Sequence, residues 1–148
     1  MLKNMMIAVV AMAAASAQTV PASGMKVDGK AVRFTRVYAF STEGFFDKKK
    51  DDTVVILADR FGLRRMAGEG KLNCVRATIN GSGQMINYLV GSQAFKAIPS
   101  GGSTEQVFEG TNDGRTIAGK VRTKGEQQFF GTKYEYEATF RAGVQPRK

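Results

Sequence analysis

The sequence predicts an all-β fold: a single antiparallel β-sandwich or small β-barrel of about seven strands, with at most one or two short helical turns. Short apolar stretches alternate at period two along much of the chain, as expected of strands with one buried face. Turn sequences rich in Gly, Asn and Asp separate these stretches. All 17 glycines of the 148-residue chain lie beyond Ala17, and hairpin turns need the positive φ that glycine adopts without strain.

The first part of the domain predicts a hairpin turn and two long strands. Asp28-Gly29 is a typical hairpin-turn sequence. Residues 31–41 form the first long strand, and alternation assigns one side of it to Val32, Phe34, Tyr38 and Phe40. Residues 53–58 are continuously apolar and rich in β-branched side chains, which favours a strand buried on both faces.

The segment between these two strands, residues 42–52, is polar and is expected to be a loop. Its two aromatic side chains, Phe45 and Phe46, are expected to fold back over an open edge of the core. Residues 93–98 follow Ser92 and precede Pro99, a pattern that favours a short capped helix.

The clearest alternation lies near the C-terminus, after a hairpin predicted around Asn80–Gly83 and a strand over residues 116–123. It points four side chains inward, Tyr134, Tyr136, Ala138 and Phe140. It points five outward, Lys133, Glu135, Glu137, Thr139 and Arg141. The full inward aromatic set is Phe34, Tyr38, Phe40, Tyr88, Tyr134, Tyr136 and Phe140. These residues predict either a packed core or the lining of a cavity for an apolar molecule.

The N-terminus predicts an export signal over residues 1–17. Lys3 precedes an apolar run that ends in Ala15-Ser16-Ala17, a small-x-small cleavage sequence. We therefore expect cleavage after Ala17 and a periplasmic or secreted protein. The remaining chain divides into a flexible lead-in over 18–26, the β-domain over 27–142 and a basic tail over 143–148.

The composition excludes several kinds of catalytic and metal site. The chain has no His and only one Cys, which excludes Ser-His-Asp and Cys-His catalysis and His-ligated metal sites. Glu135 and Glu137 share one face, but Lys133 and Arg141 lie on it too, so surface ion pairing is the simpler interpretation. We therefore expect no catalytic residue, no metal site and no cofactor. Cys74 is expected to be buried and inert, and if exposed it would link two chains.

The net charge is +9, and it falls to +8 when residues 1–17 are removed. Such a charge favours anionic partners, although it also serves solubility. Cations interleave with apolar residues in one stretch, and the binding residues predicted there are Arg60, Phe61, Arg64, Arg65 and Lys71. This stretch would meet an anionic lipid or glycan, or else it is an ordinary loop that covers the end of the core.

Four segments of the chain stand out together: Lys26–Lys30, Thr53–Asp59, Ile117–Val121 and Phe129–Phe140. They resemble a loose group of small exported bacterial proteins of unknown function. The resemblance implies a β-rich fold and an exported location, and it carries no catalytic residues.

The sequence as a whole predicts an exported non-enzymatic binding or accessory domain that docks on an anionic envelope component or a protein partner. One alternative is a β-barrel that binds a small apolar ligand, and another is an envelope inhibitor or immunity protein. We expect no nucleic-acid partner, because stacking aromatics are scarce near the cations. We also expect no transmembrane segment, and a monomer or weak dimer.

Overall fold

The computed structural model describes residues 23–59, 72–102 and 104–147, and within them the chain forms eleven strands and no helix. Four strands are short: β1 (Gly24–Val27), β2 (Lys30–Arg33), β7 (Ser100–Gly101) and β10 (Gln127–Phe129). Seven are long: β3 (Arg36–Thr42), β4 (Asp52–Ala58), β5 (Cys74–Ile79), β6 (Met85–Gly91), β8 (Gln106–Asn112), β9 (Thr116–Thr123) and β11 (Thr132–Gln145). The all-β prediction is confirmed.

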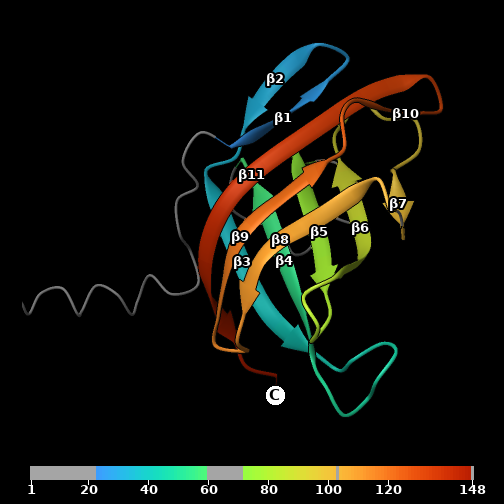
Figure 1. Ribbon diagram of the computed structural model, residues 1–148. Coiled ribbons are helices and arrows are strands. Elements are labelled where there is room, and N and C mark those ends of the chain that lie inside the picture. The colour runs from blue at the N-terminus through green and yellow to red at the C-terminus, as the bar shows by residue number, and fades with distance from the viewer. Residues whose placement is uncertain (1–22, 60–71, 103, 148) are drawn as a thin grey trace, which may run out of the picture.

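The seven long strands follow one another as an up-and-down meander (Figure 1). Antiparallel ladders join β3 to β4, β5 and β6 in turn, and join β8 to β9 and β11. An odd number of alternating strands leaves the last one parallel to the first. Accordingly β11 pairs in parallel with β3 through Val144 and Gln145. One parallel pair therefore stands in a sheet that the sequence predicts to be wholly antiparallel.

The single sheet rolls into two layers. Strands β3 to β6 form one layer, while β8, β9 and β11 cross in front of it and carry the β1–β2 hairpin (Figure 1). No ladder joins β6 to β8 in the described residues, although the two strands contact each other. The roll is thus hydrogen-bonded through β11 and open along the other side.

The core fills the space between the two layers. Its fully buried members come from both, including Val37, Leu57 and Val75 from one layer and Ile117 and Val121 from the other. The predicted alternation of β11 is confirmed, because its even-numbered residues from Tyr134 to Ala142 are buried.

Strand β4 is buried along its whole length, as the sequence predicts for residues 53–58. Val55 and Leu57 belong to the main core. Val54 and Ile56 point to the opposite face, where they form a second apolar cluster. A continuous apolar run is therefore used on both sides of the sheet.

The predicted inward position of Tyr38 and Phe40 is wrong. Both pack partly buried in the second cluster, while Val37 and Ala39 take the core positions. The chain leaves strand geometry between β2 and β3, where Phe34 enters the core. That break shifts the alternation by one residue, and a shift of one residue exchanges the two faces of a strand.

Three further expectations differ from the structure. Strand β1 begins at Gly24, inside the expected lead-in, and β11 runs to Gln145, inside the expected tail. Residues 93–98 form a turn rather than a helix, because Phe95 is drawn into the core against Tyr134. No helix in the described part of the chain is long and apolar enough to span a bilayer.

The two aromatic side chains of the β3–β4 connection do not cover the core. Phe45 is 70% exposed and Phe46 is 75% exposed. The loop that carries them projects from the lower end of the molecule in Figure 1, and neither ring folds back over the core.

Candidate functional site

The binding residues that the sequence singles out are not placed. Arg60, Phe61, Arg64, Arg65 and Lys71 all lie outside the described residues. The structure therefore neither brings them together nor separates them. The candidate site described below comes from other cations.

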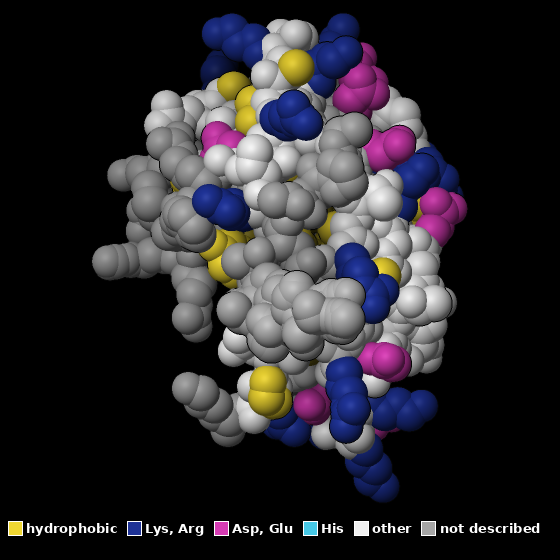
Figure 2. Space-filling model, turned by 90° about the vertical axis from the view of Figure 1, so that its left-hand side faces the viewer, with side chains coloured by type: hydrophobic (Ala, Val, Ile, Leu, Met, Phe, Trp, Pro, Cys, Tyr) yellow, Lys and Arg dark blue, Asp and Glu magenta, His cyan; other side chains and the backbone are white. Residues whose placement is uncertain are grey.

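The outward side chains of β1, β2, β8, β9 and β11 form one surface, which we call the charged face. It is set by the strand register, which places Lys26 beside Glu135 and Glu137 beside Arg122. Its cations are Lys26, Arg33, Lys120, Arg122, Lys133 and Arg141. Its carboxylates are Glu109, Glu135 and Glu137. Along the right-hand flank of Figure 2, cationic and acidic side chains interleave in the same way.

Each carboxylate of the charged face has a cationic partner. Lys26 Nζ lies 3.9 Å from Glu135, Lys120 Nζ lies 3.4 Å from Glu137, and Arg122 Nε lies 3.5 Å from Glu109. These pairs are long and open to solvent, so each contributes about 0–1 kcal/mol and exchanges readily for another partner.

Three cations of the charged face are left over. Arg33, Lys133 and Arg141 make no ion pair within the described residues. The face thus carries an uncompensated positive charge, which attracts anions from solution.

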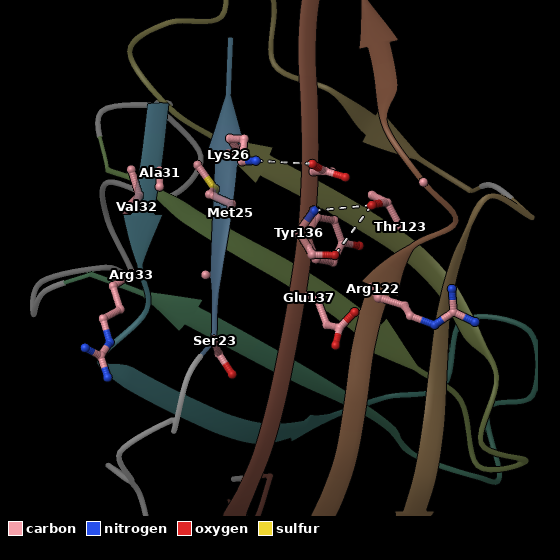
Figure 3. A pocket seen from close by; sticks show the side chains of 13 residues that line it. Ser23, Met25, Lys26, Ala31, Val32, Arg33, Arg122, Thr123, Tyr136 and Glu137 are labelled. Carbon is pink, nitrogen blue, oxygen red and sulfur yellow. Dashed lines mark hydrogen bonds and ion pairs between the residues drawn. The ribbon is translucent and has the colours of Figure 1, made fainter. Parts of the chain in front are cut away.

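A shallow groove of about 760 Å³ crosses the charged face between the β1–β2 hairpin and β9 (Figure 3). One row of the sheet runs across it, from Arg33 on β2 through Gly24 and Glu137 to Arg122 on β9. The two arginines are three strand spacings apart, which is roughly 14 Å between their backbones. The groove therefore has one arginine at each side, with Gly24 and the carboxylate of Glu137 between them.

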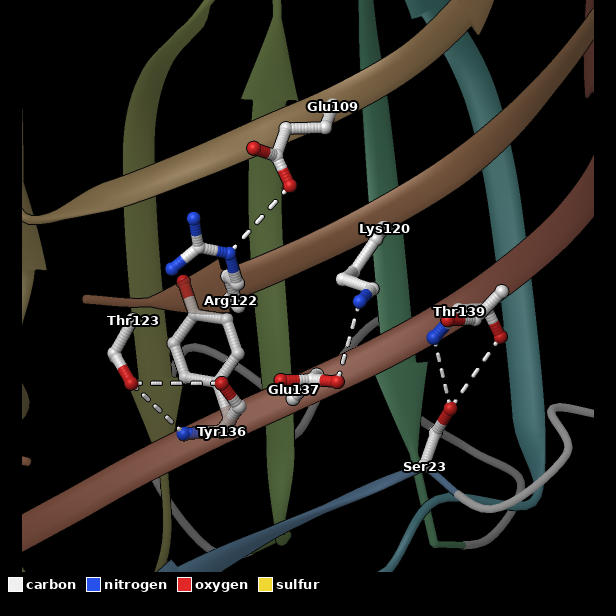
Figure 4. A network of polar contacts seen from close by, with 8 residues as sticks. All are labelled: Ser23, Glu109, Lys120, Arg122, Thr123, Tyr136, Glu137 and Thr139. Atoms are coloured by element: carbon white, nitrogen blue, oxygen red, sulfur yellow. Dashed lines mark hydrogen bonds and ion pairs between the residues drawn. The ribbon is translucent and has the colours of Figure 1, made fainter. Parts of the chain in front are cut away.

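Two hydroxyl groups hold the floor of the groove rigid (Figure 4). Ser23 Oγ accepts a hydrogen bond from the N–H of Thr139 at 2.9 Å and donates to its carbonyl at 3.3 Å. Thr123 Oγ1 accepts from the N–H of Tyr136 at 3.3 Å and donates to its carbonyl at 3.5 Å. Both hydroxyls thus bind the backbone of β11, so the charged side chains stand on a fixed scaffold.

A polar cluster lies on the other side of β11, inside the roll. Gln106 Nε2 donates to the hydroxyl of Tyr134 at 2.9 Å, and the hydroxyl of Tyr136 donates to Gln106 Oε1 at 2.7 Å. Burial raises the pKa of both tyrosines far above the usual value, and the neighbouring Tyr88 adds to the effect on Tyr134. These tyrosines are neutral hydrogen-bonding groups of the core. The sequence does not reveal Gln106 as their partner, because it follows a loop at the start of β8.

The thiol of Cys74 is fully buried in the second apolar cluster. Desolvation raises its pKa to about 11. A thiol in this state is a poor nucleophile near neutral pH, and its burial prevents a link between two chains in the folded protein. In the described ranges no three acidic or Cys side chains come together as metal ligands.

Comparison with known proteins gives no relative: no protein-family model, no curated protein and no solved structure matches the chain.

Proposed function

We propose that this protein is an exported, non-enzymatic binding domain whose charged face docks on a hydrophilic polyanion of the cell envelope, a phosphate- or carboxylate-bearing polysaccharide. The single observation that carries the proposal is the set of unpaired cations on the charged face: Arg33 lines the groove, and Lys133 and Arg141 lie on β11 to either side of it. Lys26, Lys120 and Arg122 are held only in weak ion pairs, so an anionic ligand can replace their carboxylate partners.

The spacing of the cations favours a polymer over a small anion. Arg33 and Arg122 stand roughly 14 Å apart across the sheet, which is too far for a single phosphate or carboxylate to bridge. A chain with repeated anionic groups would contact both arginines at once. Contacts made together on one chain reinforce each other through effective concentration.

The surface chemistry of the face favours a hydrophilic ligand. The large hydrophobic side chains exposed in the described residues are Phe45, Phe46 and Phe130, and all three lie in loops or turns rather than on the charged face. The inward aromatics Tyr134, Tyr136 and Phe140 are part of the packed core, which supports this proposal over a barrel for a small apolar ligand.

The test compares two variants that lose the same charge. Arg33→Ser/Arg141→Ser removes two cations of the charged face, and Lys96→Ser/Arg115→Ser removes two exposed cations from loops elsewhere. The probe is heparin, a sulfated and carboxylated polysaccharide, with neutral dextran as the blank, and the measurement is calorimetric titration at low and high salt.

We expect the first variant to lose roughly tenfold in affinity for heparin, because each lost contact is worth about 0.5–1 kcal/mol. The matched variant should lose much less. Equal losses of affinity in the two variants would mean that heparin binding depends on net charge and not on the charged face, which would refute the proposal. An absence of heparin binding at low salt would refute it as well.

A further inference from the structure

The β3–β4 loop, residues 43–51, presents a pair of aromatic side chains to solvent. The rings of Phe45 and Phe46 meet edge to face with their centroids 4.8 Å apart, and they are 70% and 75% exposed. Full burial of a phenylalanine side chain stabilises by about 1.5–3 kcal/mol. Neither ring gains this within the chain, so both are available to an apolar partner.

The loop is a built structure that holds the rings outward. The N–H of Phe45 donates to Asp52 Oδ2 at 2.9 Å. The N–H groups of Lys49 and Lys50 donate to the side chain and the carbonyl of Asp47, at 2.9 Å and 3.0 Å. A Cβ on Gly44 would collide with the carbonyl oxygens that face it across the loop. The close turn therefore requires glycine at this position.

Each acidic side chain of the loop already has a partner within the chain. Glu43 pairs with Lys48 at 3.8 Å, and Asp51 pairs with Arg147 at 3.1 Å. Asp52 is buried, and Asp47 accepts from the backbone. Lys49 and Lys50 are exposed and make no ion pair in the described part of the chain.

We propose that this loop inserts into the headgroup region of an anionic lipid bilayer. Phenyl rings placed next to lysines match the boundary between acyl chains and phosphate groups, since the rings enter the apolar side while the ammonium groups stay with the phosphates. Figure 1 places the loop at the lower end of the molecule, and Figure 2 shows cationic side chains with acidic ones among them at that end. The loop projects beyond the sheet, so a flat surface reaches it without obstruction.

This contact is separate from the charged face and does not depend on the function proposed for it. The loop binds a bilayer through aromatic insertion, whereas the charged face lacks exposed large hydrophobics. Each proposal can therefore fail alone, because its test uses different residues and a different probe.

The chain offers a matched control at its other end. Phe130 is 72% exposed in the β10–β11 turn, and Figure 1 places that turn at the end of the molecule opposite to the β3–β4 loop. The control is as apolar and as accessible as Phe45 and Phe46, but no run of lysines adjoins it. Any general stickiness of an exposed phenylalanine would affect both ends alike.

The experiment measures co-sedimentation with vesicles of phosphatidylglycerol and phosphatidylcholine, and with phosphatidylcholine alone. We expect the unaltered protein to bind the anionic vesicles. Phe45→Ser/Phe46→Ser should lose roughly tenfold or more in affinity, whereas Phe130→Ser should bind as the unaltered protein does. Thermal unfolding of each variant confirms that it is folded.

A second readout uses the absence of Trp from the chain. Phe46→Trp places a single fluorophore in the loop, and its emission should shift to shorter wavelength on anionic vesicles. Phe130→Trp should show no such shift. Absence of vesicle binding, retention of full affinity by the double serine variant, or equal spectral shifts at the two positions would each overturn the proposal.

Discussion

The carboxylate of Asp52 accepts a hydrogen bond from the backbone N–H of Phe45 across 2.9 Å, while only 4% of Asp52 is exposed. Asp52 is the first residue of β4 and lies opposite Thr42, the last residue of β3. A buried acceptor at this position joins the start of the loop to the end of the sheet. The side chain of Asp52 on β4 thus holds the backbone of the loop that carries the two exposed phenylalanines.

Replacement of Asp52 with Ala should free the loop and destabilise the fold. The variant leaves a backbone donor without its partner, which costs about 1–3 kcal/mol. Urea unfolding measures the loss, and amide hydrogen exchange at Phe45 should become faster. Asp52→Asn keeps an acceptor oxygen and should lose less than Asp52→Ala. Unchanged exchange at Phe45 in the alanine variant would contradict the anchoring role.

Replacement of Gln106 with Leu should destabilise the roll at its open side. Gln106 is 3% exposed and is bonded to the hydroxyls of both Tyr134 and Tyr136. The leucine would leave two buried hydroxyls without this partner, at about 1–3 kcal/mol each before relaxation. Denaturant titration measures the effect, and removal of the two hydroxyls as well, in a triple variant with Tyr134→Phe and Tyr136→Phe, should recover part of it. A Gln106→Leu variant as stable as the parent would show that water satisfies these groups.

Stability should fall at alkaline pH in two stages. The pKa of Cys74 is raised from 9.0 to about 11 by burial, so the unfolded chain loses this proton first and unfolding becomes easier as pH rises through that window. The raised pKa of Tyr134 and Tyr136 acts in the same direction above their ordinary value of 10.0. Urea midpoints between pH 8 and 11 measure the decline.

The control for this pH dependence is Cys74→Ala, which removes the first stage and should leave the decline that begins at higher pH. In the unaltered protein, a thiol reagent should react with Cys74 only as fast as the chain opens. Rapid reaction of the folded protein at neutral pH would show that the thiol is accessible.

Replacement of Phe130 with Asn should stabilise the β10–β11 turn. Phe130 has a φ of 50° and Gly131 a φ of 82°, nearly the geometry of Asp28-Gly29, with 49° and 83°. A bulky residue in this left-handed region is strained by about 1 kcal/mol, whereas Asn adopts it readily. We expect a rise in Tm, and Gly131→Ala should lower it. A lower Tm for Phe130→Asn would mean that the contact of Phe129 with Phe130 outweighs the strain.

Part of the charged face can be predicted from the period-two alternation of the sequence. The alternation from Lys133 to Arg141 correctly predicts which side of β11 faces solvent. Its partners do not follow, because Lys26 and Lys120 reach Glu135 and Glu137 from strands distant along the chain. Strand register between distant segments depends on the packing of the whole sheet, and period-two alternation contains no information about it.

The exposed position of Phe45 and Phe46 also depends on a contact that the sequence pattern does not predict. The sequence marks residues 42–52 as a loop, and it contains the turn-forming glycine and the charges. The buried carboxylate of Asp52, however, acquires its role only when β3 and β4 pair. Two adjacent aromatics favour a contact with the core, but in the structure the hydrogen-bonded loop leaves both rings exposed.

Local sequence patterns correctly predict the all-β class, the turn at Asp28-Gly29, the burial of residues 53–58 on both faces and the inward and outward sides of β11. These properties depend on near neighbours: apolar periodicity and the φ preferences of turn residues. Four other features appear only in the folded chain: the parallel junction of β11 with β3, the exchange of faces along β3, the groove between Arg33 and Arg122, and the exposure of Phe45 and Phe46. Each of these arises from segments far apart in the chain, whose contacts form only when the sheet rolls around one core.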